Sequence, residues 1–199
     1  MPSLAVDGAV TPILHVSQLA AALGLPEPEA APSARLAWDA TAVLRAWLDH
    51  LRPLTSELLT RPTPSRGRSL RNLTVNVFHP FELLPAAWHT GRFDWNPDGD
   101  AEREARLTAA EQVVGYAARA YVDWSDFLLE DGRELERRDP RVASPRGEVL
   151  YSALLDSQRT HAAFHYRQLV EFLRAEGAPP RDVLPLERLA GLELPAQVF

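Results

Sequence analysis

The stretch that decides the fold is residues 160–168, which read Thr-His-Ala-Ala-Phe-His-Tyr-Arg-Gln late in a strongly helical segment. His161 and His165 are four residues apart, so on a helix their Cβ atoms project from one face, about 5–6 Å apart. Both lie on the apolar stripe of that helix, where core residues are expected. The stripe consists of Leu150, Leu154, His161, His165, Leu169 and Phe172. The pair could bind one metal ion, or it could be two half-buried, hydrogen-bonded core histidines.

Three long helices are expected from the local pattern, and this segment belongs to the last of them. The first begins near Ser33 and ends at the two prolines of residues 61–64, which cannot continue a helix. Another spans roughly 101–130, and Thr108 and Glu111 within it have capping-box spacing. The histidine helix itself is expected to begin with Ser144 as N-cap and Pro145 at its first position, and to end at Gly177.

The segment from Leu70 to Phe81 fits two structures. Residues 73–77 alternate between apolar and polar like a strand, whereas Leu70, Leu73, Val77 and Phe81 also match a helical face. Pro80 would remove one hydrogen bond from a helix and disfavours the α conformation at the residue before it. The local pattern leaves both readings open.

The rest of the chain surrounds this helical body. Residues 1–33 are expected to form an N-terminal extension, with a short helix over residues 13–23 and a proline-rich linker. The body is expected to span residues 34–178. Residues 179–199, which carry five leucines and a terminal phenylalanine from residue 184 onward, are expected to form a C-terminal tail packed on it.

Composition excludes several classes of function. A net charge of −6 without a basic stripe argues against nucleic-acid binding. No apolar run approaches the roughly 18 residues of a membrane span, and the N-terminus lacks a signal-peptide pattern, so a cytoplasmic location is expected. The chain has no cysteine, and all 21 of its basic residues are arginine. Thiolate ligands, cysteine nucleophiles and Schiff-base lysines are therefore excluded, and any metal must be held by imidazole and oxygen atoms.

Two segments resemble the DinB/YfiT-like metalloenzyme family. They are His161-x-x-x-His165-x-x-Gln168 and the upstream run from Arg66 through Asn76 to His79. The resemblance covers roughly residues 35–175. It implies an all-α fold, a four-helix bundle of up-down-down-up topology, and the helical reading of residues 73–77.

The resemblance also implies a divalent metal held by His79, His161 and His165. Zinc and nickel are the first candidates, and iron and manganese are further ones. Some members of the family transfer low-molecular-weight thiols or isomerise maleylpyruvate with mycothiol. Family members often form dimers, so a homodimer is expected.

The chain departs from the family pattern around His79. Pro80 follows it directly, and Leu84 replaces an acidic residue that the family often has further along the helix. Glu82 could supply the missing carboxylate near the metal. His50, on the shoulder of the first helix's apolar stripe, is a reserve ligand if His79 is misaligned, or else a buried, hydrogen-bonded histidine.

Other polar residues near the motif have two readings each. Gln158 and Gln168 flank the histidine pair at −3 and +3 and could bind a metal-bound water or a ligand, or could be solvated. Arg66, Arg68 and Arg71 could bind a carboxylate substrate or form a solvated helix start.

The sequence is compatible with two functions, which belong to different classes. The first is a metal-dependent enzyme acting on a small molecule, either a transferase that uses a low-molecular-weight thiol or a hydrolase. Position 162 is alanine, so the HExxH protease pattern is absent and no catalytic side chain is assigned. The second is a non-catalytic bundle that binds a metal or a small ligand.

Overall fold

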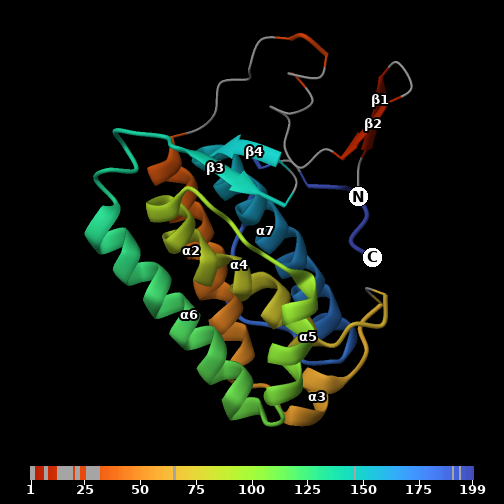
Figure 1. The fold of residues 1–199 in the computed structure, drawn as a ribbon. Helices are drawn as coiled ribbons and strands as arrows, with labels where there is room; N and C mark the ends of the chain where they lie inside the picture. Colours follow the sequence, from red (N-terminus) through yellow and green to blue (C-terminus); the bar gives the residue numbers. More distant parts are fainter. Residues whose placement is uncertain are drawn as a thin grey trace.

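The protein is mostly helical, as expected (Figure 1). The computed structural model describes residues 3–6, 9–12, 20, 23–25, 32–64, 66–145, 147–189, 191–192 and 194–199. The long helices are α2 (Ser33–Leu51), α4 (Leu70–Thr90), α6 (Ala110–Asp131) and α7 (Tyr151–Ala175). The shorter ones are α3 (Ser56–Thr60), α5 (Pro97–Arg106) and the 3-10 helix η1 (Leu186–Arg188).

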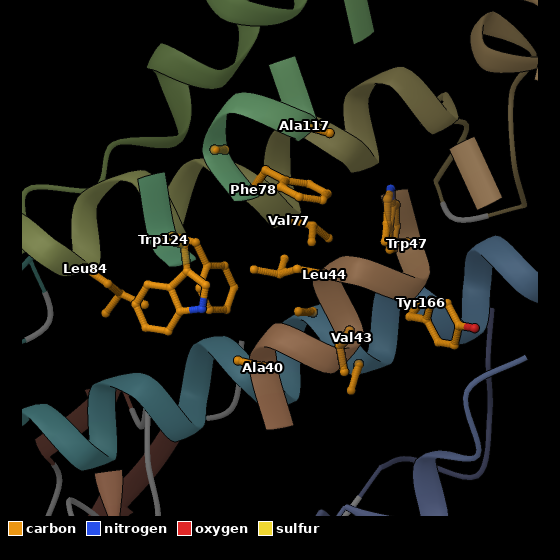
Figure 2. Packing of buried hydrophobic residues seen from close by; sticks show 14 of the residues in the cluster. Ala40, Val43, Leu44, Trp47, Val77, Phe78, Leu84, Ala117, Trp124 and Tyr166 are labelled. Atoms are coloured by element: carbon orange, nitrogen blue, oxygen red, sulfur yellow. The ribbon is translucent and has the colours of Figure 1, made fainter. Parts of the chain in front are cut away.

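Each of the four long helices packs against two of the others. α2 and α4 both contact α6 and α7. Figure 2 shows Leu44 and Trp47 of α2 gathered with Val77 and Phe78 of α4 in the core between these helices. This packing makes α4 and α7, which carry His79 and the histidine pair, direct neighbours.

Two buried tryptophans join helices through both their rings and their N–H groups. Trp47 Nε1 donates to Thr74 Oγ1 at 3.2 Å and links α2 to α4, and Trp124 Nε1 donates to Thr41 Oγ1 at 2.9 Å and links α6 to α2. Both side chains are 0% exposed. A buried indole N–H without a partner would cost free energy, so these bonds fix how the helices pack.

Helix α4 resolves the ambiguous segment in favour of the helix, so the helical prediction for residues 73–77 is confirmed. The Ser69 side chain caps its start by accepting from the Asn72 N–H at 3.1 Å, and Gly91 ends it in the left-handed conformation. Pro80 and Pro85 lie inside the helix. The burial of Leu73, Val77 and Phe81, all 0–1% exposed, outweighs the backbone hydrogen bonds that the two prolines remove.

Two expected helices are wrong in extent because each is interrupted. The first ends at Leu51, since Pro53 lacks an N–H, and α3 begins after Thr55, whose side chain accepts from the Leu58 N–H. The expected helix over 101–130 is two helices, α5 and α6. The expected capping box is also wrong: Gln112, not Glu111, accepts from the backbone at residues 108–109 and starts α6.

The predicted start of the histidine helix is wrong as well. β3 (Arg141–Ser144) and β4 (Gly147–Leu150) pair as an antiparallel hairpin, and α7 begins only at Tyr151. Val142 and Val149 pair across the hairpin and are both buried. The Ser144 hydroxyl donates to the Gly147 carbonyl instead of capping a helix. The hairpin lies against the beginning of α7 (Figure 1).

The ends of the chain add two further features. Near the N-terminus, β1 (Ser3–Val6) pairs antiparallel with β2 (Ala9–Pro12), and the sequence pattern did not indicate this hairpin. The expected short helix over 13–23 and the proline-rich linker lie almost wholly outside the described residues. In the part of the chain that the structure describes, no helix is long and apolar enough to cross a lipid bilayer.

The C-terminal segment is bound to α7 through three consecutive residues. Tyr166 Oη accepts from the Leu184 N–H at 2.9 Å, and Arg167 donates to the carbonyls of Pro195 and Ala196. Gln168 Nε2 donates to the Val198 carbonyl at 2.7 Å. The last residues therefore lie beside the histidine motif.

Candidate metal site

The interface of α4 with α7, next to α5, holds a network of buried and half-buried polar side chains. His79 pairs with Asp100, the residue that α5 contributes, and the Nδ1–Oδ1 distance is 2.5 Å. The two residues are 4% and 5% exposed. A carboxylate can only accept, so His79 Nδ1 carries the proton and the lone pair of the neutral ring lies on Nε2.

Asn76, one turn before His79 on α4, connects Asp100 to the histidine pair. Its Nδ2 donates to Asp100 Oδ2 at 3.3 Å, and its Oδ1 lies 3.0 Å from His161 Nε2. The carboxylate requires the amide nitrogen on its side, which fixes Oδ1 as the atom facing His161. His161 Nε2 is therefore the donor, and the lone pair of its neutral ring lies on Nδ1.

The two histidines of α7 are in contact with each other. Their ring centroids are 4.6 Å apart, with an angle of 70° between the planes. His165 Nδ1 donates to Gln168 Oε1 at 2.7 Å, and Gln168 is itself held by the Val198 carbonyl. These bonds place the lone pair of His165 on Nε2. The rings of His161 and His165 were expected to share one face of the helix, and they do.

His165 is held in its neutral form. Burial, and to a smaller extent the positive charge of Arg68, lowers the pKa of His165 to about 4, although the hydrogen bond to Gln168 opposes the shift. A metal binds the neutral imidazole, so this state requires no loss of a proton near pH 7. The same observation places Arg68 close to the site.

The donor chemistry fits a divalent metal, but the ring positions are not those of a closed site. Metal-binding histidines usually donate their second ring N–H to a carboxylate, carbonyl or water, and His79 and His165 each have such a side-chain acceptor. Among the residues that the structure describes, however, no three His, Cys, Asp or Glu side chains are arranged to hold one ion. Since His161 directs Nε2 to Asn76, its ring must turn before it can join a common site.

The other sequence candidates lie in several places. Gln168 contacts His165, and Gln158 is buried on the same helix. Glu82 accepts a hydrogen bond from Tyr116 Oη of α6 at 3.0 Å. Its Oε2 also lies 3.6 Å from Nε of Arg103 on α5. Its described partners therefore do not include a histidine.

The reserve ligand His50 belongs to a separate network. Its Nε2 is 2.9 Å from Tyr166 Oη, and the two rings are stacked with centroids 5.6 Å apart. Burial lowers the pKa of His50, although Asp49 and Asp182 oppose the shift. Tyr166 Oη also accepts from the Leu184 N–H, so the same phenol joins His50 to the C-terminal segment.

The three arginines before His79 lie in different environments. Arg71 pairs with Glu104 at 3.2 Å, so it belongs to the packing of α5 on α4. Arg68 is partly buried, and Arg66 is exposed with a positive φ of 55°. Of these three arginines, Arg68 is the one whose charge lowers the pKa of His165.

Two residues of the network were not assigned a role by the sequence. Asn76 lies three residues before His79, and this helical spacing could have indicated a shared face. Asp100 is one of several acidic residues that follow the turn at residues 96–99, and no feature of the sequence distinguishes it from the others.

In comparisons with protein-family models, curated proteins and solved structures, no match was found.

Proposed function

We propose that this chain is a four-helix bundle of the DinB/YfiT type, with up-down-down-up topology, that binds a divalent metal through His79, His161 and His165. The proposal rests on one observation: a hydrogen-bonded network through Asp100 and Asn76 joins His79 to His161 across α4, α5 and α7. Direct contact between the rings of His161 and His165 supports it. Zinc and nickel are the first ions to test, because imidazole suits both, and iron and manganese follow.

The surrounding residues would orient the ligands. Asp100 and Gln168 each accept a ring N–H, which leaves Nε2 of His79 and His165 for coordination. His161 would exchange its bond with Asn76 for the metal. The Asn76 amide, held by Asp100, would then be free to bind a ligand of the ion.

We propose a metal-dependent transferase of a low-molecular-weight thiol as the activity, with a hydrolase as the variant in which water replaces the thiol. A bound ion would supply Lewis acidity and favour the deprotonated form of the thiol or water. Without cysteine or lysine, the chain lacks a thiol or amine nucleophile of its own, so the nucleophile must come from outside. A cytoplasmic homodimer is part of the same proposal.

The second candidate is a non-catalytic bundle that binds a small ligand, and one observation favours it. A groove of about 1270 Å³ lies between α2 and residues 178–185. Its lining is largely apolar, with His50 among the polar groups. A large apolar pocket with a few polar groups is the usual form of a small-molecule site.

Metal analysis of single-histidine variants tests the first candidate. Purified protein should contain about one equivalent of metal, and His79→Ala, His161→Ala and His165→Ala should each lose most of it while keeping their helical circular dichroism. His50→Ala and His89→Ala are the controls, since neither residue belongs to the network. If His50→Ala loses the metal and His79→Ala retains it, the third ligand is His50 and not His79.

A screen of small thiols and electrophiles then separates the two functions. Metal-loaded protein should turn over at least one pair, and His161→Ala should not. Metal-free protein that turns over at the full rate would reject the metal-dependent enzyme. Metal-loaded protein that is inert toward every pair, but binds an apolar ligand in the groove beside His50, would favour the second candidate.

A further inference from the structure

A pocket lined by arginines lies between the end of α5 and the first half of α6. It has a volume of about 400 Å³. Its lining residues are Arg103, Arg106, Leu107, Gln112, Tyr116 and Arg119. Half of these side chains are guanidinium groups, in a chain whose net charge is −6. The pocket therefore has a local charge opposite to that of the whole protein.

One of the three arginines is already neutralised, and the other two are not. Arg103 Nε lies 3.6 Å from Glu82 Oε2, so this pair carries no net charge. Arg106 and Arg119 make no ion pair or hydrogen bond with any of the residues that the structure describes. Both side chains are exposed, and the pocket thus has an excess of two positive charges that an anion from solution can approach.

The acceptors near the pocket are occupied. Glu82 accepts from Tyr116 Oη at 3.0 Å. The Gln112 carbonyl oxygen accepts from the backbone N–H groups of Thr108 and Ala109 at 2.7 and 3.1 Å, which leaves the amide nitrogen as its remaining polar group. The pocket consequently presents donors rather than acceptors, which suits an anion and not a metal cation.

Backbone geometry positions at least one of the guanidinium groups. Arg119 Nη1 lies 3.5 Å from the point that a Cβ on Gly115 would occupy, so the side chain lies back along α6 toward Tyr116 and Gln112. Burial, and after it the Glu82 carboxylate, raises the pKa of Tyr116 well above its ordinary value. The phenol therefore remains a neutral donor to Glu82 near pH 7 and leaves the positive charge of the pocket intact.

We propose that this pocket binds a phosphoryl dianion, with Arg106 and Arg119 as its principal ligands. Two guanidinium forks match the charge and the oxygen geometry of a phosphate group. The volume exceeds that of phosphate alone, so a small organic phosphate monoester fits as well as the free ion. The site stands on this pocket and does not depend on metal binding.

The pocket is linked to the histidine network through α5, which lines it, and through α4, whose Glu82 contacts two of its lining residues. Glu82 follows His79 by three residues on α4, and Arg103 follows Asp100 by three residues on α5. Three residues correspond to a rise of about 4.5 Å. Arg106, one of the two proposed ligands, follows Asp100 by six residues, a rise of about 9 Å, so a bound phosphate would lie beside the candidate metal site and not in it.

Calorimetric titration with inorganic phosphate and with phenyl phosphate, in a low-salt buffer without phosphate, tests the proposal. Wild type should show saturable binding of one equivalent, and the double variant R106Q/R119Q should bind at least tenfold more weakly. Arg137→Gln is the matched control, because its side chain is 72% exposed and lies outside the pocket. Thermal unfolding of the three proteins checks that each is folded.

The two ligands distinguish the two sources of the phosphate group. Tighter binding of phenyl phosphate would identify a monoester as the ligand class, and equal affinities would identify phosphate itself. Equal affinities in wild type and R106Q/R119Q would overturn the site. So would a loss of affinity in Arg137→Gln as large as that in R106Q/R119Q, or binding to wild type that does not saturate. Metal-stripped protein should bind phosphate with unchanged affinity, which separates this proposal from the metal site.

Discussion

Replacing His165 by asparagine should change how the stability of the protein depends on pH. His165 is 4% exposed, and burial lowers its pKa from 6.5 to about 4. The asparagine Nδ2 takes nearly the position of the histidine Nδ1, so it can still donate to Gln168 Oε1. The variant therefore removes the titrating group while keeping the hydrogen bond.

The sign and the size of the effect follow from the two pKa values. Between pH 6.5 and about pH 4 the unfolded chain binds a proton at His165 and the folded chain does not. Acid therefore favours the unfolded state, and wild type loses stability as the pH falls through this window. A shift of this size corresponds to about 3 kcal/mol, at 1.36 kcal/mol for each pKa unit. Below pH 4 both states are protonated and the loss ends.

Urea unfolding of metal-free wild type and His165→Asn, from pH 3.5 to pH 8 with a chelator present, measures this directly. The difference between their free energies of unfolding should be constant above pH 7, which serves as the internal control. Between pH 7 and pH 4 it should move by about 3 kcal/mol in favour of the variant. The carboxylates titrate alike in both proteins, so their contributions cancel in the difference between the two free energies of unfolding. A difference that stays constant across the whole range would show that His165 is not buried as described.

Three further predictions concern single positions. Asp100→Asn should weaken metal binding about 10- to 100-fold in a competition titration, because it weakens the acceptor that orients His79; an unchanged affinity would place Asp100 outside the site. Asp39→Ala should destabilise the fold by about 1–3 kcal/mol in urea, because Arg159, 1% exposed, loses a carboxylate 3.1 Å away and keeps only that of Asp156 at 2.6 Å; a change below about 0.5 kcal/mol would contradict this. Leu44→Ala should cost about 2–5 kcal/mol by the same measurement, since Leu44 is 0% exposed in the core; a shift in m-value alone would contradict it.

The positions of the long helices could be predicted because each carries a dense apolar stripe. The α4 segment shows where local pattern was insufficient. Its alternation at residues 73–77 matched a strand, and only the packing of both faces, between α6 and α7, makes a helix the better solution. The resemblance to a known family, and not the local pattern, led to the correct prediction there.

The breaks within helices could be predicted less well. Pro53 was a visible signal for the end of α2, but the apolar stripe continues past it through Leu54 and Leu58. The β3–β4 hairpin has a strand pattern of only four residues on each side, and the Ser144-Pro145 pair at its turn is equally typical of a helix start. The burial of Val142 and Val149 decides whether the hairpin or the helix forms, and a local pattern does not contain that information.

The candidate site was predictable where its residues share one helix. His161 and His165 lie four residues apart, so their contact follows from helical geometry alone. Asp100 lies 21 residues after His79, and their pairing depends on how α5 folds back on α4. Such a contact is set by tertiary packing, which the sequence pattern of either segment does not encode.

A crystal structure of the nickel-loaded protein, with anomalous data at the nickel edge, tests the central claim most directly. We predict one anomalous peak at the interface of α4 and α7, with nitrogen atoms of His79, His161 and His165 at about 2.0–2.2 Å, close to the distances known for imidazole ligands. His161 should have left Asn76, while Asp100 and Gln168 should still accept from His79 and His165. A peak beside His50 instead, or no peak while His161 still contacts Asn76, would contradict the account.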